Sequence, residues 1–91
     1  MISMLYSIYD RGVQSFAAPV LASSETQIKR SLLDLFTADS NRPVLERSPL
    51  VRYPEDYDLY YLGLFDTEKG ELRPVEVIQR VCSLVEFTIG G

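Results

Sequence analysis

The sequence that decides the fold is Tyr53-Pro54-Glu55-Asp56-Tyr57-Asp58-Leu59-Tyr60-Tyr61-Leu62-Gly63-Leu64-Phe65-Asp66-Thr67-Glu68-Lys69-Gly70. Its proline predicts a tight turn, and the aromatic run over residues 57–66 predicts a long strand. Both faces of that strand are apolar, so we expect it in the middle of a sheet that is covered on both sides. Residues 66–70 predict a hairpin loop with Gly70 in the left-handed conformation, and residues 71–75 predict the returning strand.

The start of the chain predicts another hairpin, over residues 1–21. Residues 3–9 alternate with the period of a strand, which places Met4, Tyr6 and Ile8 on one face. Residues 10–12 predict the turn. Residues 14–21 predict a second strand that ends or lies at a sheet edge, because proline at position 19 cannot donate a ladder hydrogen bond.

A helix is predicted over residues 25–37. Ser24-Glu25-Thr26-Gln27 matches a capping box, in which the serine oxygen accepts from the backbone of Gln27 and the glutamine side chain reaches back. Apolar residues then recur at helical spacing, at Ile28, Leu32, Leu35 and Phe36. The segment that ends at Pro43 stops the helix, because the residue before a proline avoids helical dihedrals.

The remaining segments carry weaker patterns. Residues 40–54 predict a long connection without regular structure, and such connections are either functional or flexible. In the tail, residues 76–91, Val and Ile favour a strand, yet the apolar residues between Val77 and Val85 also fit a helical stripe. We predict a helix over residues 76–85.

The chain is therefore predicted to be a single α+β domain of residues 1–91. A small antiparallel sheet forms from two β-hairpins with the capped helix between them, in the order ββαββ, and a C-terminal helix follows. In chain order, the first hairpin, helix, connection, second hairpin and tail are residues 1–21, 25–37, 40–54, 57–75 and 76–91. A parallel pairing of the first and third strands is also open, since the intervening helix would permit it.

Composition restricts the function. The net charge of −4 argues against non-specific binding to nucleic acid, because phosphate contacts need clustered Lys and Arg. The chain has no histidine, which is the usual general base and the commonest metal ligand. No phosphate-binding loop, zinc spacing or nucleophile motif is present, so we expect no enzyme activity, no metal and no cofactor. Cys82 lies in an apolar run and is expected to be buried and inert.

Neither a signal peptide nor a membrane span is predicted. Residues 1–9 are apolar but lack a basic start, and Asp10-Arg11 follows them directly. No apolar run approaches the roughly 20 residues that cross a bilayer. We expect a soluble intracellular protein.

Three groups of residues could carry chemistry or binding. The acids Glu55, Asp56 and Asp58 could bind a cation, but acids after a proline more often cap a short helical turn. The aliphatic tail could be an assembly surface or could close the core. The third group combines aromatic rings with cations, as single-strand binders do, although tyrosines also pack in sheets and arginines are usually solvated. Its members are Arg47, Arg52, Tyr53, Tyr57, Tyr60 and Tyr61.

Three segments resemble a known family. They are Leu5-Tyr6-Ser7-Ile8-Tyr9-Asp10, then Phe16-Ala17-Ala18-Pro19, and above all residues 53–66 together with Gly70. In this order they resemble the small nonstructural protein of gokushoviruses, single-stranded DNA phages of the microvirus group. The family is described as a DNA-binding or nonstructural early protein, made in the infected bacterium and absent from the virion. The resemblance implies a part in genome replication or in handling single strands in the host cytoplasm.

Two hypotheses follow. In the first, the protein binds single-stranded DNA as a homo-oligomer, because oligomerisation places several weak basic patches side by side. The candidate DNA-binding residues are Arg47, Arg52, Tyr53, Tyr60 and Tyr61, with Lys29 and Arg30 contacting phosphates from the helix. In the second, the chain is an acidic protein-interaction module. It would bind a phage replication or capsid protein, or a host protein, through a sheet edge or the tail and without DNA.

Overall fold

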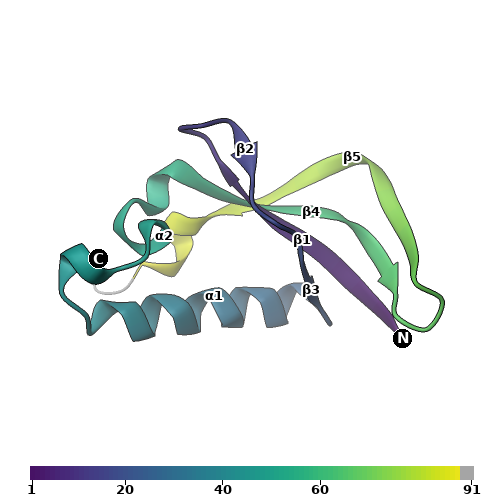
Figure 1. Cartoon of the computed structure of the whole chain (residues 1–91), viewed down its shortest axis with the longest axis horizontal. Coiled ribbons are helices and arrows are strands. Elements are labelled where there is room, and N and C mark those ends of the chain that lie inside the picture. Colours follow the sequence, from purple (N-terminus) through teal and green to yellow (C-terminus); the bar gives the residue numbers. More distant parts are fainter. Residues whose placement is uncertain (89–91) are drawn as a thin grey trace.

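An antiparallel sheet with one main helix forms the fold in a computed structural model that describes residues 1–88 (Figure 1). The sheet order is β2-β1-β4-β5, with β3 also paired to β1. The strands are β1 (Ile2–Asp10), β2 (Ser15–Phe16), β3 (Val20–Ala22), β4 (Tyr57–Asp66) and β5 (Glu71–Ser83). The predicted α+β class and its two hairpins with a helix between them are therefore confirmed.

The first and third predicted strands pair side by side, and they do so antiparallel. In the register of β1 with β4, Asp10 pairs with Tyr57 and Ile2 with Asp66. The parallel alternative is wrong because the connection after the helix returns the chain to the end of β1, so β4 starts where β1 stops.

The core lies between the sheet and α1 (Glu25–Ser40), on what we call the inner face of the sheet. Tyr6, Leu59 and Cys82 come from neighbouring strands and are buried there. Facing them from α1 are the buried Ile28, Leu32 and Phe36. Met4 and Ile8 pack against this core, which confirms the predicted inward face of β1. The opposite side is called the outer face.

The helix begins as its capping box predicts. The Ser24 Oγ accepts a hydrogen bond of 3.1 Å from the backbone N–H of Gln27. The Gln27 side chain reaches back to the backbone N–H of Ser23. The helix extends to Ser40, beyond the predicted end at residue 37, because Pro43 is still too far along the chain to stop it.

Residues 41–56 are more regular than predicted. The connection holds two 3-10 turns, η1 (Val44–Glu46) and η2 (Pro54–Asp56), and a one-turn helix, α2 (Pro49–Arg52). Pro49 and Pro54 each stand in the first turn of a helix, where a missing N–H costs nothing. Leu50 and Val51 pack against the core, so the connection covers the end of the inner face.

The predicted C-terminal helix over residues 76–85 is wrong. Strand β5 continues to Ser83 and is followed by a short 3-10 helix, η3 (Leu84–Phe87). Pairing with β4 supplies the hydrogen bonds of this segment, and its β-branched residues suit a strand. Leu84 and Phe87 enter the core, so the tail covers the inner face and not the outer one. The predicted tail continues into residues 89–91, which lie outside the described residues.

The pairing of β4 with β5 is interrupted by an arch in β5. Tyr61 pairs with Gln79 and Gly63 with Pro74, so residues 75–78 lie opposite Leu62 alone. Figure 1 shows β5 rising away from β4 at this point. A bulge bends its strand, and here it contributes to the curl of the sheet.

Gly63 allows β5 to return close to β4 beside this arch. Its φ is +152°, and a Cβ there would lie 2.4 Å from the carbonyl oxygen of Arg73. A side chain at this position is therefore excluded by both backbone conformation and space.

Candidate nucleic-acid interface

The outer face of the sheet carries three aromatic rings in mutual contact. Tyr9 pairs with Phe16 in the β1–β2 ladder, and their ring centroids are 4.6 Å apart. Tyr60 of β4 lies 5.8 Å from Tyr9 and 5.4 Å from Phe16, edge-on to both. We call Tyr9, Phe16 and Tyr60 the aromatic trio. Phe16 is exposed and both tyrosines are half-buried, so the trio forms part of the molecular surface.

A buried carboxylate beside the trio holds two guanidinium groups. The Asp58 side chain is 5% exposed, and its oxygens lie 3.1 Å from Arg80 Nη2 and 3.4 Å from Arg11 Nε. Arg80 comes from β5 and pairs across the sheet with Tyr60. Both arginines remain about half exposed, so N–H groups not used by Asp58 face water. The cluster keeps one net positive charge.

This arrangement has the parts of a single-strand binding surface. Exposed aromatic rings can stack on bases, and each stacked base contributes about 1–3 kcal/mol. Guanidinium groups bind phosphate oxygens with two parallel N–H donors. Asp58 fixes the positions of both guanidinium groups, so their positive charge lies next to the rings.

The structure separates the two adjacent tyrosines that the sequence grouped as candidates. Tyr60 belongs to the trio on the outer face. Tyr61 points the other way and packs against the buried Tyr6, with ring centroids 5.5 Å apart. Tyr57 also packs against the core, and burial raises the pKa of its hydroxyl above the ordinary value. Tyr61 and Tyr57 therefore serve packing.

The candidate residues of the connection lie away from the trio. Arg47 closes the segment after α1, donating from Nε to the Arg42 carbonyl at 2.9 Å and from Nη2 to the Ser40 carbonyl at 3.0 Å. Arg52 stacks on the neighbouring Tyr53, with its guanidinium carbon 5.2 Å from the ring centroid. Tyr53 is exposed and Arg52 is half-buried, and the pair lies at the end of α2, away from the trio.

The candidate phosphate contacts on α1 lie across the sheet from the trio. Lys29 Nζ lies 3.8 Å from a Glu25 oxygen and 3.6 Å from a Glu86 oxygen, so nearby carboxylates offset its positive charge. Arg30 is exposed on the same helix. Of the seven candidate residues, the structure thus brings Tyr60 alone to the aromatic trio.

The acidic candidates are also separated. Glu55 and Asp56 stand in the first turn of η2, while Asp58 forms the ion pairs with arginine. Among residues 1–88, no group of three or more His, Cys, Asp or Glu side chains is placed to hold a metal ion. Cys82 is buried as expected, and burial raises the pKa of its thiol to about 11.

Four residues of the interface were not predicted from the sequence. They are Tyr9, Arg11 and Phe16 of the first hairpin and Arg80 of β5. The alternation of β1 does place Tyr9 opposite the inward Tyr6, and that signal could have identified it. The positions of Phe16 and Arg80 beside Tyr60 depend on the register between strands, which a single sequence does not specify.

Comparison with known proteins agrees with the resemblance. A family model described as "Phage ORF5 protein" matches residues 3–87. Protein ORF5 of Chlamydia phage 1, a gokushovirus of the Microviridae, is 36% identical over 73 residues. That alignment covers 78% of this chain and 71% of the relative. No solved structure matches the chain. Within residues 1–88, none of the helices has the length and apolar character needed to cross a membrane.

Proposed function

The chain belongs to the Phage ORF5 protein family, and we propose that it binds single-stranded DNA on the outer face of its sheet. The observation that carries the proposal is the aromatic trio, three rings in contact on the molecular surface with two guanidinium groups beside them. A nonstructural role during replication or handling of the phage genome, in the cytoplasm of the infected bacterium, accords with this proposal.

The trio favours a single strand over a duplex. Stacking on a protein ring needs a base whose face is free, and bases in a duplex already stack on each other. Rings of this kind bind with little sequence preference because every base has a π-face. We therefore expect binding that depends on strandedness more than on sequence.

The charge of the protein sets the expected affinity for single-stranded DNA. The whole chain carries −4, and the Asp58 cluster supplies one positive charge locally. Few phosphates are neutralised, so one copy binds weakly. For a single strand, log K falls against log salt with a slope of about −0.7 for each phosphate that the protein neutralises. Binding of this kind is strongest at low salt.

The test is a fluorescence-anisotropy titration of a labelled oligothymidylate at low and at physiological salt. We expect saturable binding that weakens with salt. Tyr60→Ala should weaken it roughly 5- to 150-fold, which is the loss of about 1–3 kcal/mol of stacking. Tyr53→Ala is the matched control, because it removes an exposed tyrosine outside the trio. Absence of binding at low salt, or equal losses in both variants, contradicts the proposal.

This is a binding function and not a catalytic one. The trio and the Asp58 cluster hold and orient a ligand, and their side chains have no part in bond-breaking in the proposal. The expected readout is therefore occupancy of DNA, measured by anisotropy or by protection of the strand from nuclease.

The acidic charge favours a second candidate function, an adaptor that binds a basic phage or host protein. Purification from infected cells separates the two. It should recover phage single strands if the first proposal holds. Recovery of one basic protein in stoichiometric amount, with no nucleic acid, supports the second.

A further inference from the structure

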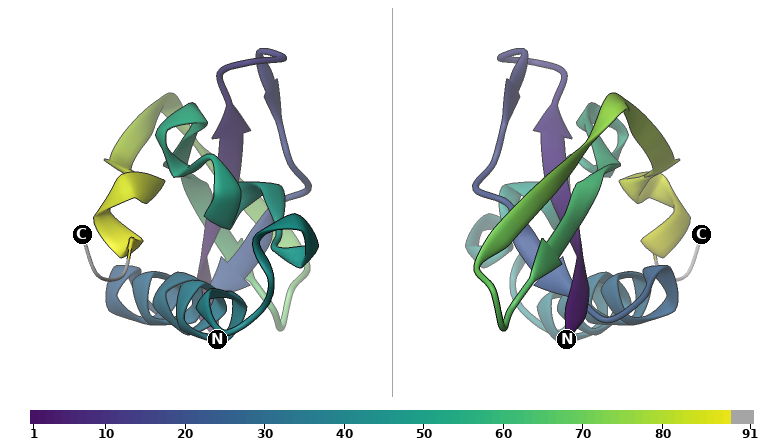
Figure 2. Two further views of the ribbon diagram at one scale, coloured as in Figure 1. Left: turned by 90° about the vertical axis from the view of Figure 1, so that its left-hand side faces the viewer. Right: turned by 90° about the vertical axis from the view of Figure 1, so that its right-hand side faces the viewer.

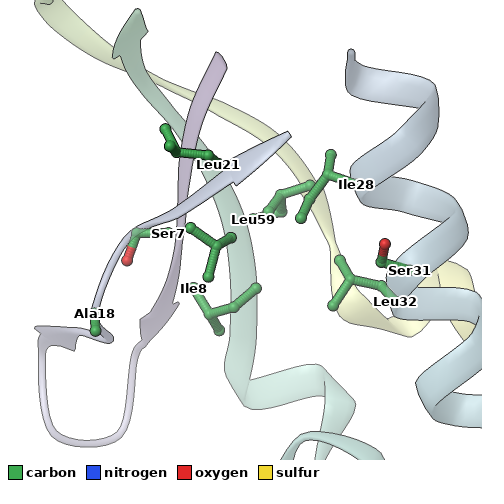
Figure 3. Close-up of a pocket in the computed structure, with 9 residues that line it drawn as sticks. Ser7, Ile8, Ala18, Leu21, Ile28, Ser31, Leu32 and Leu59 are labelled. Carbon is green, nitrogen blue, oxygen red and sulfur yellow. The ribbon is translucent and has the colours of Figure 1, made fainter. Parts of the chain in front are cut away.

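The core is open at one edge of the molecule. A groove of about 290 Å³ lies between the start of α1 and the segment that leads from β2 into β3. Figure 3 shows Ile8 and Leu59 of the sheet facing Ile28 and Leu32 of α1 across it. Val20 and Ala18 also line the groove, so apolar side chains from three segments surround it.

The opposite edge of the same core is closed by the chain itself. Leu84 and Phe87 of η3 are 0% and 5% exposed, and Phe87 packs on Phe36 of α1 with ring centroids 6.1 Å apart. In Figure 2, η3 and the β2–β3 segment lie on opposite sides of the molecule above α1. The open groove is thus the counterpart of the site that η3 fills.

The rim of the open groove is apolar and uncharged. Val20 and Leu21 of β3 are 49% and 47% exposed, and Phe16 nearby is also exposed. Residues 12–24 contain no charged side chain, although the chain as a whole carries −4. Two copies can therefore approach each other at this edge with little charge repulsion.

We infer that a second copy of this chain covers the open groove. Val20 and Leu21 line the groove and are half exposed, so the same uncharged apolar patch of each copy would meet its counterpart across a two-fold axis. A second groove of about 270 Å³ is lined by Asp10 and by Phe16 of the aromatic trio, so we place the dimer contact at β3 and the first groove only. In this dimer the two β3 strands lie antiparallel, and Val20 and Leu21 of each copy contact the partner.

Other occupants fit this edge less well. The first groove, at about 290 Å³, is at the lower end of the roughly 300–1,000 Å³ typical of small-molecule sites. Nucleic acid would need cations, and residues 12–24 supply none. The inference goes beyond the proposed DNA binding and does not depend on it.

Light scattering after size-exclusion chromatography tests the inference. We expect the full chain at tens of micromolar to have twice the mass of one copy. Leu21→Asp should give the mass of one copy, because it places two carboxylates in the contact. Val77→Asp is the matched control at the other sheet edge, where Val77 is exposed on β5, and it should keep the doubled mass. A monomeric wild-type chain at this concentration, or equal masses in both variants, overturns the inference.

Cross-linking tests the contact without a charged substitution. Leu21→Cys should form a covalent dimer under mild oxidation, and Val77→Cys should remain largely uncrosslinked. The native Cys82 does not compete, because it is buried and the pKa of its thiol is raised to about 11. Equal cross-linking at both positions would count against the β3 contact. Both readouts are independent of DNA, so they can fail while DNA binding holds, or the reverse.

Discussion

The two edges of the sheet differ in how the core beneath them is finished. At the β5 edge, η3 folds under the sheet and its apolar side chains are almost fully buried. At the β3 edge, the apolar side chains of Val20 and Leu21 remain about half exposed around a groove. A small domain buries a limited share of its surface. The chain completes one edge with its own residues, and we propose that a second copy completes the other.

The largest expected effect breaks the closed edge. Phe87→Ala removes a buried ring and should lower the free energy of unfolding by about 3–5 kcal/mol. Val20→Ala, at the open edge, should cost about 1 kcal/mol or less at low protein concentration, because Val20 is half exposed. Urea unfolding followed by circular dichroism measures both. Equal losses would mean that the two edges do not differ in the way described.

The next effect concerns how β5 is held against β4. Gly63→Ala places a Cβ against the backbone of Arg73, so backbone strain and overpacking together should cost about 2–4 kcal/mol. Gly70→Ala is the matched control, since Gly70 has a φ of +65° but open space around it. Its expected cost is about 1 kcal/mol, from the left-handed backbone alone. Similar urea midpoints for the two variants would contradict the close approach at Gly63.

The smallest effect is a pH dependence in the hairpin that begins β5. The backbone N–H groups of Lys69 and Glu68 donate to Asp66 Oδ1, and they lower the pKa of this carboxyl below its ordinary 3.8. The stabilisation is present above pH 3.8 and is lost as the pH falls through the lowered pKa. Asp66→Asn should therefore flatten the loss of stability as the pH falls below 3.8. Asp34→Asn, a substitution at an exposed position of α1, should leave the pH dependence of stability unchanged.

Local signals were enough to predict most of the fold. The capping box at Ser24, the alternation of β1 and the turn at Gly70 each act within a few residues, and each is found in the structure. The end of the chain was mispredicted because its apolar spacing fits both periods. Pairing with β4, a contact distant in sequence, decided in favour of a strand.

The candidate site depended on long-range register, and the sequence predicted little of it. Adjacent tyrosines at positions 60 and 61 were grouped together, although neighbours on a strand face opposite sides. The trio forms because the β1–β2 and β1–β4 registers bring Tyr9, Phe16 and Tyr60 together. Arg80 lies beside them because β5 extends to Ser83. Residues 76–85, which include Arg80, were predicted as a helix.

The arch at residues 75–78 has a consequence for assembly. An unbroken edge strand is a template on which further chains add, and a protein with two such edges can polymerise into fibrils. Here Pro74, the arch and the charges of Glu76 and Arg80 make the β5 edge a poor template. If copies join only through the proposed β3 contact, assembly therefore stops at a closed pair.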